Sequence, residues 1–246
     1  MYQFFVEPSQ IQGNRIVITG SDVNHIKNVL RMKAGDEIAV SNGMDGKEYR
    51  CGIEAFAEDE IVCGLRFIKE DGVELPSKIY LFQGLPKADK MELIIQKAVE
   101  LGAFEVIPVA AKRCVVRLDE KKAAGKISRW QGIAEAAAKQ SKRAVIPKVH
   151  SVLSMKEAVA YAQNMDVKLI PYELAEGMQH TKQMIEAVKP EQSIAVFIGP
   201  EGGFDPKEEE YLMENGFSSV SLGKNVLRAE TAAVAALSML NYEFMR

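Results

Sequence analysis

Apolar and polar residues alternate in short runs over the first 70 residues. The runs cover residues 3–6, 15–19, 37–40, 49–56 and 61–67, and a period of two is typical of strands with one buried face. A helix with Ser21 or Asp22 as its N-cap interrupts them. Asn42-Gly43 and Asp45-Gly46 supply the left-handed turns that hairpins need. We therefore predict a small β-barrel domain over residues 1–70.

The pattern changes after residues 71–77, a charged stretch with Gly and Pro that we interpret as a linker. Strands are predicted at residues 78–83, 104–109, 167–171, 193–198 and 219–222. Helices are predicted at residues 87–101, 126–142, 154–163, 178–188, 206–215 and 229–245. This alternation predicts an α/β domain over residues 78–246, with a mostly parallel sheet covered by helices on both faces.

Composition narrows the function classes. The formal net charge of −3 argues against a protein that coats nucleic acid indiscriminately, although one basic face could still bind a specific RNA. Three scattered histidines disfavour a Ser-His-Asp triad, and three cysteines without Cys-x-x-Cys spacing indicate neither a disulfide framework nor a zinc site. With no cationic leader and no apolar run of ~20 residues, we expect a cytoplasmic protein that binds neither membrane nor metal.

An apolar strand runs directly into a glycine-rich loop at residues 195–204, AVFIGPEGGF. Such loops allow a ligand to approach the backbone closely, but the same glycines also occur in ordinary strand-to-helix turns. The loop does not match the dinucleotide fingerprint G-x-G-x-x-G, and the chain has no G-x-x-x-x-G-K-[ST] phosphate loop. A dinucleotide-dependent oxidoreductase is therefore disfavoured.

A second strand end with glycine follows at residues 222–233, LGKNVLRAETAA. This strand is the next one along the chain, so we expect the two loops to emerge together at the carboxyl edge of the sheet, where open α/β folds bind ligands. Arg228 and Glu230 lie beside an apolar helix start, so they need a partner or a ligand, unless they form a surface salt bridge.

These two loops resemble the cofactor-binding half of the SPOUT methyltransferases, and the whole chain resembles the RsmE family within them. The resemblance also rests on FFV (4–6), HIKNVLRMKAGDEI (25–38), KADKMELIIQKAVELG (87–102), RCVV (113–116), RW (129–130) and EAAAKQSKRAVIP (135–147). It implies a SPOUT-type trefoil-knotted parallel-sheet methyltransferase domain, preceded by a small PUA-like β-barrel. It also implies a homodimer that uses S-adenosyl-L-methionine to methylate N3 of a uridine in 16S rRNA of the small ribosomal subunit.

The resemblance places the cofactor among three strand ends. The residues implied are Pro171, Tyr172, Glu173, Ile198, Gly199, Pro200, Glu201, Gly202, Gly203, Leu222, Gly223, Val226, Leu227 and Arg228. Main-chain groups and apolar walls suit adenine and ribose, which need few charges.

Several basic or polar side chains are candidates for RNA contacts. On the helix after residue 87, Lys90 and Lys97 share a face opposite the apolar stripe. Taken singly, each candidate could be a solvated charge, and His25 could equally cap or pack locally. Gln3 stands where the family more often has arginine. The full set is His25, Arg31, Lys33, Lys90, Lys97, Arg113, Arg129, Gln140 and Arg143.

Methylation of uridine N3 requires loss of the imide proton and stabilisation of the resulting anion. We expect Arg228 to stabilise this anion, because a guanidinium stays protonated at any working pH. Glu201 is the candidate base, with Glu173 or bulk water as alternatives, and Glu201 could instead bind cofactor or cap a helix. Two other functions remain open: methylation of another base or a ribose 2′-OH, and a non-catalytic rRNA-binding assembly factor.

Overall fold

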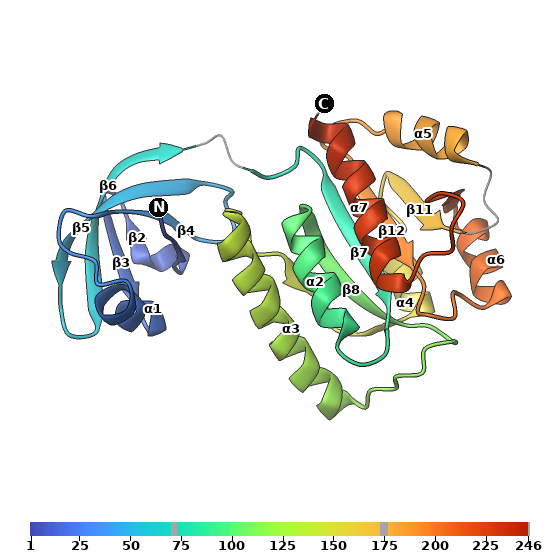
Figure 1. Cartoon of the computed structure of the whole chain (residues 1–246), viewed down its shortest axis with the longest axis horizontal. Coiled ribbons are helices and arrows are strands. Elements are labelled where there is room, and N and C mark those ends of the chain that lie inside the picture. The colour runs from blue at the N-terminus through green and yellow to red at the C-terminus, as the bar shows by residue number, and fades with distance from the viewer. Residues whose placement is uncertain (70–72, 173–176, 246) are drawn as a thin grey trace. The chain divides into compact units, whose positions relative to one another are not determined.

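The chain forms two compact units in the computed structural model, which describes residues 1–69, 73–172 and 177–245 (Figure 1). The first unit consists of Met1–Glu74 and Ala138–Ile146, and the second of Leu75–Ala137 and Pro147–Arg246. A short segment distant in sequence therefore belongs to the first unit, which local sequence patterns did not predict.

The first unit is a six-stranded sheet with the order β1-β4-β5-β6-β3-β2. Among the strand pairs that the structure describes in this sheet, only β1–β4 is parallel. Inward-facing apolar side chains of these strands, with Val23 and Ile26, form one buried core. The strands are β1 (Gln3–Phe5), β2 (Ile11–Gln12), β3 (Arg15–Thr19), β4 (Glu37–Ser41), β5 (Glu48–Phe56) and β6 (Glu60–Lys69).

Local sequence explains the turns of this sheet. Gly43 and Gly46 adopt φ values of 73° and 71°, the left-handed conformation expected for the two predicted turns. The predicted helix is a single turn, α1 (Ser21–Asn24), continued by a π-helical turn, η2 (His25–Val29). A 3-10 turn, η1 (Pro8–Gln10), follows β1.

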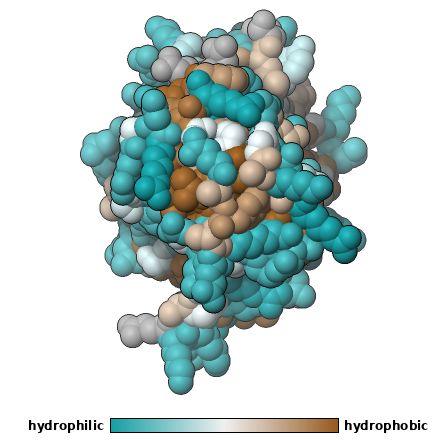
Figure 2. Space-filling model, turned by 90° about the vertical axis from the view of Figure 1, so that its left-hand side faces the viewer, coloured by the Kyte–Doolittle hydropathy of each residue, from teal (hydrophilic) through white to brown (hydrophobic). Residues whose placement is uncertain are grey.

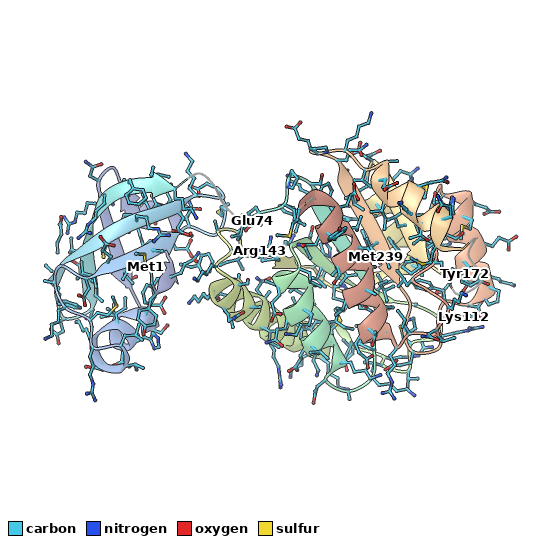
Figure 3. The ribbon with its side chains drawn as sticks, turned by 45° about the horizontal axis from the view of Figure 1, so that its top comes forward. Met1, Glu74, Lys112, Arg143, Tyr172 and Met239 are labelled. Atoms are coloured by element: carbon cyan, nitrogen blue, oxygen red, sulfur yellow. The ribbon has the colours of Figure 1, made fainter. Side chains whose placement is uncertain are left out.

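The segment 138–146 is attached to the first unit by hydrogen bonds. The Ile146 N–H donates to the Gly43 carbonyl at 3.1 Å, and the Gln3 amide donates to the Arg143 carbonyl at 2.8 Å. The Glu74 carboxylate accepts hydrogen bonds from the Arg143 guanidinium, beside which it lies in Figure 3. In the view of Figure 2, which faces the first unit, hydrophilic side chains surround a central apolar area.

The second unit contains a parallel sheet with the order β10-β8-β7-β12-β11-β13, and β9 also pairs with β8. Strand β11 lies between β12 and β13, so the two glycine-bearing strands are consecutive in sequence but are not neighbours in the sheet. The trefoil knot stays a prediction. The strands are β7 (Lys78–Gly84), β8 (Ala103–Ala110), β9 (Lys148–Val149), β10 (Leu153–Ser154), β11 (Val167–Pro171), β12 (Ser193–Ile198) and β13 (Ser218–Val220).

Helices cover this sheet, which confirms the predicted α/β class. In Figure 1, α2 and α7 lie side by side in front of the sheet. From α4, Tyr161 makes edge-on ring contacts with Tyr80 and Phe82 of β7. Among the described residues, none of the helices is long and apolar enough to cross a membrane. The helices are α2 (Lys90–Glu100), α3 (Glu120–Ser141), α4 (Met155–Ala162), α5 (Met178–Glu186), α6 (Pro206–Glu214) and α7 (Ala229–Met245).

Candidate cofactor site

A cavity of about 320 Å³ opens at the carboxyl ends of β11, β12 and β13 in the second unit. Loops after each of the three strands line it, together with residues of α6 and α7. The lining residues are Arg113, Ile170, Pro171, Tyr172, Ile198, Gly199, Pro200, Glu201, Gly202, Gly203, Phe204, Glu209, Leu222, Gly223, Asn225, Val226, Leu227, Ala229 and Ala232.

The loop after β12 packs closely against β7 and against itself. A Cβ atom at Gly84, the last residue of β7, would lie 2.6 Å from Pro200 Cδ and 2.7 Å from its backbone nitrogen. A Cβ atom at Gly199 would lie 3.0 Å from the Gly203 backbone. Gly203 has a φ of 66° and donates its N–H to the Pro200 carbonyl at 2.9 Å. Close packing therefore leaves no room for a side chain at Gly84 or Gly199, and Gly203 is favoured by its left-handed backbone.

Hydrogen bonds from neighbouring segments hold the same loop. The buried Gln83 amide donates to the Gly199 carbonyl at 3.3 Å, and the Arg113 guanidinium donates to the Gly202 carbonyl at 2.8 Å. The Lys87 N–H donates to Glu201 Oε1 at 3.0 Å. Groups from three neighbouring segments thus hold this loop in place.

Hydrogen bonds also join the chain after β11 to the end of β13. The Tyr172 N–H donates to the Val220 carbonyl at 2.9 Å, which links the ends of β11 and β13. The buried Thr181 hydroxyl of α5 donates to the Ser221 carbonyl at 3.0 Å and accepts from its N–H at 2.8 Å. Gly223 then turns the chain with a φ of 120°. Although β12 and β13 are not adjacent, β11 brings a third loop between theirs, and all three border one cavity.

Most residues predicted to bind the cofactor line this cavity. Two do not: Glu173 lies outside the described residues, and Arg228 is exposed immediately before α7 without lining the cavity. The sequence motifs did not indicate Ile170, Phe204, Glu209, Asn225, Ala229 and Ala232, and Arg113 was predicted to contact RNA instead. Five of the six unpredicted residues lie within four residues of a predicted one, so extending each motif would have found them. Glu209 is the exception, because it lies on α6.

The Glu201 carboxylate is engaged in polar contacts on the side of α2. Besides the Lys87 N–H, its Oε1 contacts Lys90 Nζ at 3.2 Å. Burial alone would raise its pKa, but these donors outweigh burial and hold the pKa of Glu201 below its ordinary value. A carboxylate with a lowered pKa has little proton affinity near neutral pH. Its observed contacts therefore fit a structural role better than that of a base.

The residues predicted to contact RNA fall into three groups. Arg143 is only 3% exposed and pairs with Glu74, so its predicted contact with RNA is corrected: the guanidinium is a buried structural group. Four candidates already have partners in the second unit. Lys90 pairs with Glu201 and Glu230, and Lys97 pairs with Glu100. Arg113 donates to the Gly202 carbonyl, and Arg129 pairs with Glu92. His25, Arg31, Lys33 and Gln140 are exposed in the first unit.

Metal-ligating side chains do not gather at the cavity. Within residues 1–69, 73–172 and 177–245, no group of three or more His, Cys, Asp or Glu side chains is placed to hold a metal ion. The three cysteines are free and buried, and burial raises the pKa of both Cys51 and Cys63 to about 12. Their thiols are therefore neutral near physiological pH.

Known protein families match both parts of the chain. An RNA methyltransferase domain family matches residues 73–241, and an RNA methyltransferase PUA domain family matches residues 18–65. The chain is 37% identical to ribosomal RNA small subunit methyltransferase E of Bacillus subtilis, over 99% of this chain and 97% of that protein. It is 35% identical to the Mesomycoplasma hyopneumoniae protein of the same name, over 97% and 98% of the two chains.

A solved structure shares the fold of the whole chain. The crystal structure of a ribosomal RNA small subunit methyltransferase E from Neisseria gonorrhoeae, bound to S-adenosyl methionine, superposes with a TM-score of 0.83 at 30% identity. The match covers 98% of this chain and 97% of that one. The chain therefore belongs to the ribosomal RNA small subunit methyltransferase E family, as its sequence motifs predicted.

Proposed function

We propose that this member of the ribosomal RNA small subunit methyltransferase E family transfers a methyl group from S-adenosylmethionine to N3 of a uridine in 16S rRNA. The observation that carries the proposal is the cavity bordered by three loops at the carboxyl ends of β11, β12 and β13. In a chain of this family, that cavity is the place for the methyl donor.

S-adenosylmethionine fits the residues that line the cavity. The cavity volume of about 320 Å³ lies within the range of roughly 300–1,000 Å³ that is common for small-molecule sites. Ile198, Leu222 and Leu227 offer apolar walls for an adenine ring, and the glycines, which have no side chains, let ribose and amino-acid groups approach the backbone closely. Bound there, the donor would supply an electrophilic methyl group.

Arg228 is the residue that we assign to stabilising the uracil anion. It lies between Leu227 and Ala229, both of which line the cavity, and its side chain is exposed. No carboxylate among the described residues pairs with it. A guanidinium in this position remains charged and available as the imide proton leaves.

Among its described lining residues, the cavity offers no strong candidate for the base that accepts the imide proton. Glu201 is held by Lys87 and Lys90 with a lowered pKa, which makes it a weak base. Glu209, from the first turn of α6, is the other described carboxylate that lines the cavity. We propose that the proton leaves to solvent, and that Arg228 supplies the stabilisation that makes its loss favourable.

We assign RNA selection mainly to the first unit, part of which matches an RNA methyltransferase PUA domain. His25, Arg31, Lys33 and Gln140 are its exposed candidates, with Lys97, Arg113 and Arg129 in the second unit. A homodimer in the cytoplasm is also part of the proposal. The apolar side chains that α2 and α7 leave exposed, Leu93, Tyr242 and Met245, support a protein interface there.

Methyl transfer to isolated small ribosomal subunits tests the function directly. Subunits from a strain that lacks its own enzyme of this family would be incubated with the full chain and labelled S-adenosylmethionine, then digested to nucleosides. Label in N3-methyluridine is the expected result. Label in a 2′-O-methylated nucleoside or another base would overturn the position proposed. Subunit binding without transfer would indicate an assembly factor.

A further inference from the structure

Lys90 joins three segments of the second unit at one point. Its Nζ lies 3.2 Å from Glu201 Oε1, in the loop after β12, and 3.3 Å from Glu230 Oε2, in the first turn of α7. Lys90 is itself the first residue of α2. The side chains of Lys90, Glu201 and Glu230 are 29%, 27% and 16% exposed, so all three are partly shielded from water.

The Glu230 carboxylate depends on this contact. Its Oε2 atom is inaccessible to solvent and accepts no hydrogen bond from the described residues. A shielded carboxylate oxygen without a donor is costly, and a nearby cation reduces that cost. The Lys90 ammonium supplies that charge. Its interactions with Glu201 first, and then with Glu230, raise the pKa of Lys90 against the opposing effect of burial.

Both carboxylates adjoin segments that border the cavity. Glu201 lines the cavity itself, while Glu230 follows Ala229, which lines it, and Arg228. The chain leading into α2 is also held there, because the Lys87 N–H donates to Glu201 and Ala88 adopts a left-handed φ of 52°. A non-glycine residue in this conformation persists only where its surroundings hold it.

We propose that Lys90 is a positioning residue, which sets the spacing between the 199–204 loop and the start of α7 and thereby shapes the S-adenosylmethionine site. Without its charge, Glu201 and Glu230 would repel each other across the point where Lys90 now lies. The two cavity borders would then separate. This inference rests on the proposed function only for the identity of the ligand.

The proposal changes the role that the sequence suggested for Lys90. Its position on a polar helix face predicted an RNA contact, but its ammonium group is already shared by two carboxylates. An RNA phosphate would have to compete with both of them. We therefore expect loss of Lys90 to weaken S-adenosylmethionine binding and to leave affinity for rRNA unchanged.

Calorimetric titration of the full chain with S-adenosylmethionine tests this. Lys90→Met, which retains length and helix propensity, should weaken binding at least about tenfold, and Lys90→Arg should recover most of the loss. Lys182→Met is the matched control, because Lys182 forms an exposed i,i+4 pair with Glu186 away from the cavity lining. The control should bind like the wild type.

A variant of Glu230 separates the loss of positioning by Lys90 from a general loss of structure. Glu230→Gln removes the repulsion that Lys90→Met would create, so the double variant should bind S-adenosylmethionine more tightly than Lys90→Met alone. In methyl-transfer assays Lys90→Met should raise the KM for S-adenosylmethionine far more than it lowers kcat. If Lys90→Met does not fold, Glu230→Gln alone carries the test, with a smaller loss of affinity expected.

The outcomes distinguish this inference from the proposed function. Absence of S-adenosylmethionine binding by the wild type would overturn the proposed function, and this inference with it. Normal wild-type binding with equally tight binding by Lys90→Met would overturn this inference alone. Reduced affinity of Lys90→Met for rRNA, with unchanged affinity for the donor, would also overturn it and restore Lys90 as an RNA contact.

Discussion

The Glu74 carboxylate pairs with the buried guanidinium of Arg143, 69 residues further along the chain. Arg143 Nε lies 3.1 Å from Glu74 Oε2, and the side chain of Arg143 is 4% exposed. The backbone N–H groups of Ala144 and Val145 donate to Glu74 Oε1 at 3.1 and 3.2 Å. One carboxylate thus holds the segment 138–146 in the first unit.

Replacement of Glu74 by glutamine should destabilise the protein by about 3 kcal/mol, because it removes the carboxylate charge that lies against the buried Arg143 guanidinium. Urea unfolding of the full chain measures this. The control is Glu37→Gln, which removes the exposed Arg66–Glu37 pair and should cost less than about 1 kcal/mol. Equal effects of the two substitutions would contradict the structural role given to Glu74.

Replacement of Gly84 by alanine should weaken S-adenosylmethionine binding, since the added methyl group would collide with Pro200 and displace the loop after β12. Calorimetry on the full chain checks it. Gly125→Ala serves as control: a Cβ atom there would meet nothing within 4 Å beyond the helix's own nearby backbone, and alanine should stabilise α3 by about 1 kcal/mol. Unchanged donor affinity in Gly84→Ala would mean that the loop tolerates the displacement.

Replacement of Arg228 by alanine should lower kcat for methyl transfer by at least about a hundredfold, because the uracil anion loses its fixed positive charge. The affinity for S-adenosylmethionine should change little, since the Arg228 side chain does not line the cavity. Lys224→Ala removes another exposed cation of the same loop and should retain activity. Near-normal turnover of Arg228→Ala would remove this residue from the mechanism.

We expect the free energy of unfolding to decrease in acid, because the contribution of Asp205 is lost there. Its carboxylate pairs with Lys112 at 2.9 Å and caps the N-terminus of α6. The hydrogen bond from Lys112 is the main reason why the pKa of Asp205 lies below its ordinary value of 3.8, and burial opposes this effect. A lowered folded pKa stabilises the protein above the ordinary value, and this contribution is lost as the pH falls through the folded pKa.

The Asp205→Asn variant isolates that contribution, because asparagine is also a good N-cap but carries no charge. Urea midpoints of wild type and variant, measured from about pH 7 to about pH 3, should differ most at neutral pH and converge below pH 3.8. A difference that stays constant with pH would show that the charge of Asp205 adds nothing to stability.

Periodicity in the sequence predicted most elements to within one or two residues, because amphipathic strands and helices show their buried faces locally. Residues 167–171, 193–198 and 229–245 were predicted with the bounds of β11, β12 and α7. The start of α3 was missed by six residues, since its first two turns carry Lys121, Lys122 and Gly125 and have no apolar stripe. The two-residue strands β2, β9 and β10 are too short to show a period.

Long-range pairing was beyond such patterns. Nothing local indicates that β11 lies between β12 and β13, because strand order depends on how the whole sheet assembles. Arg143 resembled an exposed cation for the same reason: the carboxylate that compensates its burial is far away in sequence. The cofactor loops were found because their glycines and strand ends are local features, whereas Glu209 reaches the cavity from a separate helix.

The discontinuous make-up of the first unit also limits how this protein can exchange parts with its relatives. A barrel transferred as residues 1–74 alone would arrive without the Arg143 guanidinium that neutralises Glu74 and without the Ile146 N–H that binds the Gly43 carbonyl. The donor of the barrel would have to contribute residues 138–146 as well. Recombination at the apparent domain border would therefore be selected against, and the two stretches should be inherited together.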